Sequence, residues 1–218
     1  MEKRRARGCP LPPPQAPYPG YGIIPCVSTS ALIPPPAQLT GCVRAFYWHD
    51  LPQAPDLPLP QRMSRIPPNP YMAMVWLLSG EALLVEAQGQ PCERPLPRTF
   101  LAGPTRHGWR SLAITPYRSF GLVLQPGAFA LLAGDELARA AGDPTQDVRP
   151  LLDSGWQGLI EQVTHAPDHA TRQALCEGFL GARWQASRPA LSPWARLSEQ
   201  AWRYPAQAAA LRLLNWTT

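Results

Sequence analysis

The four histidines are the residues from which a metal centre would be built, but their spacing does not favour one. A cupin-type metal site takes an HxH pair from one strand and a carboxylate further on, because three donors must converge on one ion. His49, His107, His165 and His169 form no such pair. His165 and His169 lie four residues apart in a stretch of helical pattern, but Pro167 between them breaks the helical register. We therefore expect no metal and no other cofactor.

Nucleophilic chemistry has no distinct candidate either. The five cysteines are Cys9, Cys26, Cys42, Cys92 and Cys176, and no two of them form a CxxC pair. Reduced thiols without a catalytic role are the expected state in a reducing compartment. The sequence also has no GxSxG elbow, no P-loop and no GxGxxG motif. We therefore expect no catalytic residues and no enzymatic activity.

Aromatic side chains in predicted strands point instead to binding. Tyrosine and tryptophan combine apolar surface with a polar group, so at the mouth of a small barrel they can line a pocket for an apolar or aromatic ligand. Arg106, His107, Arg110 and Arg118 are candidates for the counter-charge of an anionic ligand. The predicted pocket residues are Tyr47, Trp48, Met74, Trp76, His107, Trp109 and Arg118. The alternatives are core packing for the aromatic residues and solvated loop positions for the charged ones.

Residues 39–134 contain the short apolar runs that must position these side chains. The run MAMVWLL at 72–78 is nearly continuous rather than alternating, which predicts a central strand buried on both faces. Ser79, Gly80 and Glu81 after it predict a hairpin turn. Several short strands with glycine and proline between them favour an antiparallel β-barrel or sandwich. With the helical pattern that follows, the predicted fold class is α+β.

Residues 135–190 predict helices. An amphipathic helix is indicated by apolar residues at spacings of three and four, namely Leu151, Leu152, Trp156, Leu159, Ile160 and Val163. Asp168 is the predicted N-cap of the next helix. We expect this region to be a linker and to mediate homodimerisation, with Trp156, Phe179 and Trp184 as candidate interface residues. Core packing is the alternative for Trp156 and Phe179.

Composition sets further bounds on the 218-residue chain. Hydrophobic residues make up 45%, enough for a packed core. Residues 1–38 form a basic and then proline-rich arm that we expect to be mostly irregular. The net charge is +5, but much of it lies in this arm, so no basic face for nucleic acid is expected on the globular part. No run approaches the roughly 18 apolar residues of a membrane span, and no signal peptide is apparent, so a cytoplasmic location is expected.

Residues 191–218 have the pattern of the start of a helix-turn-helix. A helix of alanines and leucines is followed by Asn215, Trp216, Thr217 and Thr218. Asparagine suits the left-handed turn, and a threonine hydroxyl suits the N-cap of a second helix. Any helix that ends in Asn-x-Thr would match equally well. The recognition helix does not follow, so we expect a truncated DNA-binding domain.

In their order along the chain, several motifs resemble the N-terminal part of AraC-type transcriptional regulators. They are PPPAQLTGCVRAFYW at 34–48, RIPPNPYMAMVWLLSG at 65–80, FLAGPTRHG at 100–108, FGLVLQPGAFALLAG at 120–134, ATRQALCEGFLGARW at 170–184 and ALRLLNWTT at 210–218. The resemblance covers about residues 31–218. It implies a cupin-like barrel over 39–134 that senses an unknown small-molecule effector, a dimerising helical region, and promoter DNA bound through a largely missing C-terminal domain.

Two other functions remain open from the sequence. A cupin-type metal enzyme would need a metal centre, and the absence of an HxH pair argues against it. A stand-alone small-molecule-binding module would need no DNA-binding domain at all. The effector, the promoter and the direction of regulation are not indicated by the residues.

Overall fold

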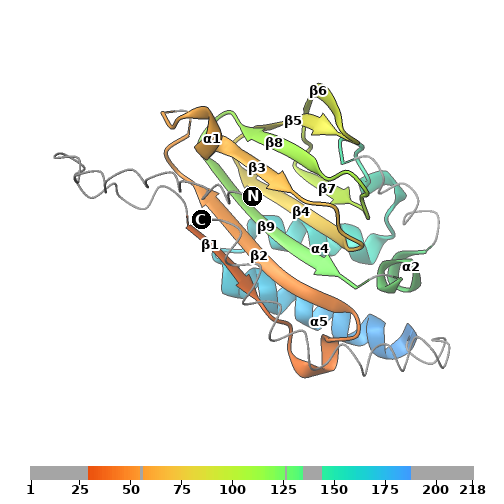
Figure 1. The fold of residues 1–218 in the computed structure, drawn as a ribbon. Coiled ribbons are helices and arrows are strands. Elements are labelled where there is room, and N and C mark those ends of the chain that lie inside the picture. The colour runs from red at the N-terminus through yellow and green to blue at the C-terminus, as the bar shows by residue number, and fades with distance from the viewer. Residues whose placement is uncertain (1–28, 55, 126, 135–143, 188–218) are drawn as a thin grey trace, which may run out of the picture.

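Two antiparallel sheets form the framework of the molecule (Figure 1). The computed structural model describes residues 29–54, 56–125, 127–134 and 144–187. The five-stranded sheet has the order β1 (Thr29–Ile33), β2 (Val43–Leu51), β9 (Tyr117–Leu124), β4 (Met72–Ser79) and β7 (Thr99–Ala102). The four-stranded sheet has the order β3 (Met63–Ile66), β8 (Trp109–Ala113), β5 (Ala82–Ala87) and β6 (Gln90–Pro95).

Helices follow the strands along the chain, so the predicted α+β class is confirmed, with the sandwich as its β part. The described helical segments are η1 (Ala37–Leu39), α1 (Leu59–Arg62), α2 (Ala128–Ala133), η2 (Arg149–Leu151), α4 (Ser154–His165) and α5 (His169–Ser187). The two long helices, α4 and α5, lie across the face of the five-stranded sheet that is turned away from the four-stranded sheet (Figure 1).

Strand β4 is buried on both faces, as its apolar run predicts. It lies between β9 and β7 within the five-stranded sheet. Met74 and Trp76 belong to the core beneath the helices, while Val75 and Leu77 pack in the space between the two sheets. Side chains alternate between the faces of a strand, so a strand covered on both sides needs apolar residues at consecutive positions.

One local expectation was wrong, and one strand was not foreseen. The turn at Gly80 is no hairpin within a sheet, because it carries the chain from β4 in one sheet to β5 in the other. Gly80 has φ +81°, and a Cβ there would lie 2.0 Å from the Pro116 carbonyl oxygen, so the crossing requires glycine. Residues 29–33, near the end of the arm that was expected to be mostly irregular, form edge strand β1, in which Leu32 and Ile33 suit a half-covered strand beside β2.

The largest hydrophobic core lies between the five-stranded sheet and the helices. Phe46, Trp76 and Phe120 contribute from the strands. Trp156 of α4 and Trp184 of α5 contribute from the helices and are 0% and 2% exposed. Core packing is therefore the role that the structure gives to these two tryptophans, which were also considered for an interface. The helices are part of the packed domain.

Asp153 and Asp168 define the starts of the two long helices. The Asp153 carboxylate accepts hydrogen bonds from the backbone N–H groups of Gly155 and Trp156 at 2.9 and 3.0 Å. Asp168 accepts one from the Thr171 N–H at 2.7 Å, which confirms the predicted N-cap. The break predicted at Pro167 is also confirmed, since α4 ends at His165 and α5 begins at His169.

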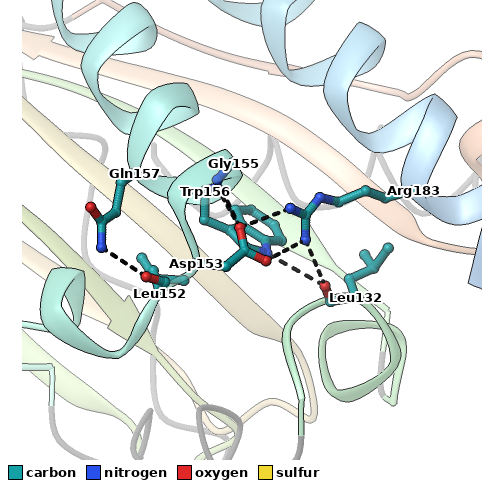
Figure 2. A network of polar contacts seen from close by, with 7 residues as sticks. All are labelled: Leu132, Leu152, Asp153, Gly155, Trp156, Gln157 and Arg183. Atoms are coloured by element: carbon teal, nitrogen blue, oxygen red, sulfur yellow. Dashed lines mark hydrogen bonds and ion pairs between the residues drawn. The ribbon is translucent and has the colours of Figure 1, made fainter.

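A polar network ties α2, α4 and α5 together (Figure 2). The Arg183 guanidinium of α5 donates to both carboxylate oxygens of Asp153, each at 2.8 Å. Its Nη1 also donates to the Leu132 carbonyl of α2 at 3.3 Å, and the Trp156 Nε1 donates to the same carbonyl at 3.4 Å. The guanidinium lies 4.7 Å from the ring centroid of Phe179. These contacts fix the end of α5 against the start of α4.

The predicted helix-turn-helix residues Asn215, Trp216, Thr217 and Thr218 lie outside the described residues, as do the first 28 residues of the arm.

Candidate ligand-binding cavity

A cavity of about 610 Å³ opens at one end of the sandwich. The β5–β6 hairpin forms one wall, and the loop of residues 103–108 between β7 and β8 forms another. Pro144, which precedes η2 and α4, is also among the lining residues. Among the described lining residues, the polar and aromatic side chains are those of Gln88, Gln90, Cys92, Arg94, Thr105, Arg106, His107 and Trp109. The volume is in the range of natural small-molecule sites.

The loop that carries Arg106 and His107 is held by backbone contacts. Thr105 and Asn69 exchange two backbone hydrogen bonds, each of 3.0 Å. The Thr105 hydroxyl accepts from the Gly108 N–H at 3.0 Å and from the His107 N–H at 3.4 Å. Gly108 has φ +73°, and a Cβ there would lie 2.4 Å from the backbone oxygen of Ile66. The sequence T-x-x-G therefore fixes a tight turn that presents two basic side chains beside the cavity.

Strand β6 supplies a thiol and a third basic side chain by simple alternation. Cys92 and Arg94 are two residues apart, so they share a face of the strand, and both are half-buried. Glu93 between them is exposed. The Cys92 thiol makes a long contact of 3.5 Å with the Leu84 carbonyl oxygen, which places it against β5.

Trp109 connects the cavity to the interior of the sandwich. Its ring meets that of Phe100 edge to face, with 6.4 Å between the ring centroids. Phe100 is 1% exposed and belongs to the cluster packed between the two sheets. Trp109 is therefore a rigidly supported aromatic surface on the cavity wall.

The described lining is basic. Arg94, Arg106 and His107 contribute to it, and it includes no carboxylate. The neighbouring Glu86 is engaged elsewhere, because its carboxylate pairs with Arg110 at 3.2 Å across β5 and β8.

The seven predicted pocket residues are not brought together. His107 and Trp109 line the cavity. Trp48, Met74 and Trp76 point to the opposite side of the five-stranded sheet and pack beneath the helices. Tyr47 points between the sheets, where its ring covers Gly121. The reason is the period of two in a strand, which turns the adjacent Tyr47 and Trp48 to opposite faces.

Arg118, the remaining predicted pocket residue, belongs to a polar cluster beneath the start of α5. Its Nε lies 3.3 Å from Oδ2 of Asp50, and the Nε2 of His169 lies 3.5 Å from the same oxygen. The His169 ring stacks on Trp48 at 4.8 Å. Burial lowers the pKa of His169, while Asp50 opposes this shift. This cluster joins β2, β9 and α5, and it is distinct from the cavity.

Sequence reasoning missed Gln90, Cys92 and Arg94 as members of one lining. The alternation of QPCERP places Cys92 and Arg94 on one face, but only the two-sheet arrangement brings that face opposite residues 103–108. Arg106 was considered as a counter-charge and does line the cavity, whereas Arg110 pairs with Glu86.

The described part of the chain has neither a cluster of metal ligands nor a membrane-spanning helix. Its histidines, cysteines and carboxylates include no group of three or more placed to hold a metal ion. Cys176 is buried, and burial raises the pKa of its thiol. None of the described helices combines the length and apolar character needed to cross a bilayer.

Comparison with known proteins gives a likeness to solved structures. No family model matches the chain, and no curated protein matches it. Among solved structures, the chain is similar to an RmlC-like cupin protein from Desulfovibrio desulfuricans. The two share 12% identity with a TM-score of 0.31, over 45% of this chain and 83% of that one.

Proposed function

We propose that residues 29–187 are the ligand-sensing part of a DNA-binding transcriptional regulator of the AraC type, and that the cavity beside Trp109 binds its effector. The observation that carries the proposal is an aromatic-walled cavity whose described lining includes basic side chains and Pro144, at the entry to the helical part. The order of the AraC-like motifs along the sequence supports the regulator class.

The cavity is suited to binding rather than to chemical conversion. Cys92, which supplies the thiol of the described lining, lies against the Leu84 carbonyl. His107 stands on the turn of residues 105–108, and the described lining holds no carboxylate that could orient its ring. General acid–base catalysis needs a proton-transfer group that is positioned by a partner. A rigid aromatic wall with cationic groups beside it is sufficient for recognition.

A series of contacts in the helical part connects the cavity to the end of α5. A ligand that contacts Pro144 touches the segment that leads through η2 into α4. The first residues of α4 are joined to Arg183 near the end of α5 through Asp153. A ligand can shift such an arrangement only if it binds one conformation better than another. On this proposal, the partners are promoter DNA, bound by residues outside the described part, and a second copy of the chain.

The test is a genome-wide binding experiment with the complete gene product. The purified protein is incubated with fragmented genomic DNA from its host, and bound fragments are sequenced with and without host metabolite extract. Discrete enriched sites whose occupancy changes with the extract are expected, and Trp109→Leu should reduce the change without reducing binding. An absence of enriched sites would contradict the regulator proposal. Stoichiometric iron, manganese or zinc in the purified protein would instead support a metal enzyme.

A further inference from the structure

We infer that the cavity selects planar aromatic molecules, which lie against Trp109 in the space between the two sheets. The inference rests on the proposed function only in taking this cavity as the ligand site, and it does not depend on DNA binding. It narrows the ligand from any small molecule to one shape and one chemical class.

Trp109 belongs to a row of side chains on one face of the four-stranded sheet. The register pairs Trp109 of β8 with Ala87 of β5, and Ala87 with Gln90 of β6. Directly opposed residues of antiparallel strands share a face of the sheet. This face is turned towards the five-stranded sheet, because Trp109 packs against the cluster between the sheets, to which Phe100 belongs. All three residues of the row line the cavity.

Small residues leave the layer beside Trp109 unfilled. Sheets that stack face to face are about 10 Å apart, and side chains from both sheets normally fill the layer between them. Here Ala87 contributes only a methyl group from the four-stranded sheet, and Ala102 only a methyl group from the five-stranded sheet. Gly103, the next residue of the lining, has no side chain to add. The cavity of about 610 Å³ therefore includes space that larger side chains would fill.

The indole of Trp109 gives this space its preference for an aromatic ring. Trp109 is half-buried, and its ring is held edge to face against that of Phe100, which is 1% exposed. Aromatic rings in stacked or edge-to-face contact attract each other more than their buried area alone explains. A saturated ring is thicker and has no π-electrons, so it gains only the burial of its surface. The expected selection is therefore for aromatic character rather than for apolar surface.

The lining near Trp109 has little conformational freedom to lose when a ligand binds. Pro91, Pro104 and Pro144 belong to it together with the two alanines, and neither residue type loses side-chain rotamer entropy on burial. The loop after Pro104 is held by two backbone hydrogen bonds of 3.0 Å between Thr105 and Asn69. A preformed site of this kind binds a rigid planar molecule at a small ordering cost.

Two other hollows of the described structure lack a comparable aromatic wall. The described lining of the cavity of about 410 Å³ at Leu77 and Leu96 has no aromatic residue. The groove of about 570 Å³ between α4 and α5 includes Phe179, but that ring is already in contact with Trp156 and with the Arg183 guanidinium. The aromatic preference is therefore assigned to the cavity between the sheets.

The experiment compares aromatic molecules with their saturated counterparts by calorimetric titration of the full chain. The pairs are phenol with cyclohexanol, benzamide with cyclohexanecarboxamide, and 2-naphthol with decahydro-2-naphthol, all uncharged at neutral pH. For at least one pair, the aromatic member should bind about three- to tenfold more tightly, as expected for a contact between two aromatic rings. A site that selects apolar surface alone would bind the saturated member at least as tightly, because it buries at least as much apolar area.

Substitutions of Trp109 and Ala87 test where the molecule binds. Trp109→Leu should bring the two members of a pair to within about twofold of each other, whereas Trp109→Phe should retain the preference. Ala87→Leu fills the space beside the indole and should weaken both members about tenfold or more. Ala182→Leu adds the same bulk at an exposed position of α5 outside the cavity, and it should change neither affinity.

Thermal unfolding of each variant shows whether it is folded. Trp109 has a structural contact with Phe100, so Trp109→Leu is the variant most exposed to a folding defect. If it does not fold, Ala87→Leu still decides the location and Trp109→Phe still decides whether an aromatic side chain at 109 suffices.

The outcomes separate this inference from the proposed function. Saturated members that bind as tightly as their aromatic partners in every pair would overturn the inference while leaving the cavity as a ligand site. A lack of binding by every probe at millimolar concentration would also overturn it. An aromatic preference that persists in folded Trp109→Leu, or unchanged affinities in Ala87→Leu, would place the molecule elsewhere and overturn it as well. Failure of the genomic DNA experiment alone would remove the regulator and leave this inference intact.

Discussion

The Asp153 carboxylate has two roles at once: it caps α4 and it accepts a two-bond fork from Arg183 of α5. Its Oδ1 receives the backbone N–H groups of Gly155 and Trp156 as well as the Arg183 Nη2, while its Oδ2 receives Nη1. The hydrogen bonds from Arg183 and from these N–H groups lower the pKa of the carboxyl group against a smaller opposing effect of burial. Removing this side chain therefore disturbs a helix terminus and a contact between two helices together.

Substitutions of Asp153 should separate the two roles. Asparagine can still cap a helix but loses the charged fork, whereas alanine loses both. Both side chains of the pair are partly exposed, so we expect a coupling of only about 1 kcal/mol between Asp153→Asn and Arg183→Gln. Asp153→Ala should cost about a further 1 kcal/mol. Urea unfolding of the natural chain, Asp153→Asn, Arg183→Gln and the double variant measures the coupling, and unfolding of Asp153→Ala measures the further loss. A coupling of zero would mean that the two hydrogen bonds between Asp153 and Arg183 contribute no stability.

The two glycines of α4 should respond in opposite ways to alanine. Nothing lies within 4 Å of a Cβ placed at Gly158, so Gly158→Ala should stabilise by about 0.5–1 kcal/mol through helix propensity. A Cβ at Gly155 would lie 2.5 Å from the Arg183 Nη2, so Gly155→Ala displaces the guanidinium and should not stabilise. Thermal unfolding measures the change in stability of Gly158→Ala and of Gly155→Ala. In an Arg183→Gln background the difference between the two variants should shrink, and an unchanged difference would contradict this account.

Gly121 makes room for a tyrosine ring between the sheets. It lies opposite Tyr47 across β2 and β9, and a Cβ there would lie 2.0 Å from the tyrosine ring. Gly121→Ala should therefore destabilise by about 1–3 kcal/mol, as overpacking of a core does. Tyr47→Leu removes the ring, so Gly121→Ala should destabilise the protein less in that background. Chemical unfolding of the two single variants and the double variant measures this, and additive losses would show that the two residues do not compete for space.

Acidification should weaken the fold through His169. Burial lowers its folded pKa below the ordinary 6.5, and Asp50 only partly offsets this. Arg118 and Arg172 also face it and disfavour its protonated form. The unfolded chain then binds the proton more readily, so stability is lost as the pH falls from above 6.5 towards the folded pKa. The free energy of unfolding, measured between pH 7.5 and 5, should fall on acidification, and His169→Gln should make this fall shallower.

The exposed His165 provides the control for this measurement. Its side chain is 70% exposed, whereas that of His169 is 15% exposed. His165→Gln should leave the pH dependence as it is in the natural chain. Equal slopes for the natural chain and His169→Gln would contradict the assignment. His49 is half-buried, and burial lowers its pKa, so some pH dependence should remain without His169.

The sequence predicted where helices and strands lie better than it predicted which layer of the fold each side chain faces. The buried strand over 72–78, the Asp168 cap and the helix break at Pro167 follow from signals a few residues long, and the structure confirms all three. Which side of a strand meets which layer depends on residues far along the chain. The aromatic run at Tyr47 and Trp48 therefore looked like one surface, although the helices cover only one of the two side chains.

The cavity was harder to predict for the same reason. Trp109 was predicted as a pocket residue because an aromatic residue between two strands can line the mouth of a barrel, and His107 because it could supply a counter-charge; both line the cavity. Arg94 enters from a strand that meets them only through the pairing of β5 with β6 and β8. The residues of the β5–β6 hairpin do not indicate that residues 103–108 lie opposite them. Residues 103–108 likewise do not indicate the hairpin.

The position of the main core has a practical consequence for engineering. Phe46, Trp76 and Phe120 are covered by Trp156 and Trp184, so a division of the chain at residue 134, where a sensor and a linker were expected to meet, cuts through one shared interior. A gene fragment that ends at residue 134 would expose the apolar face of the five-stranded sheet to solvent. Such a fragment should aggregate. A chimera that grafts this sensor onto another output domain must keep α4 and α5 with the strands and make its junction after Ser187.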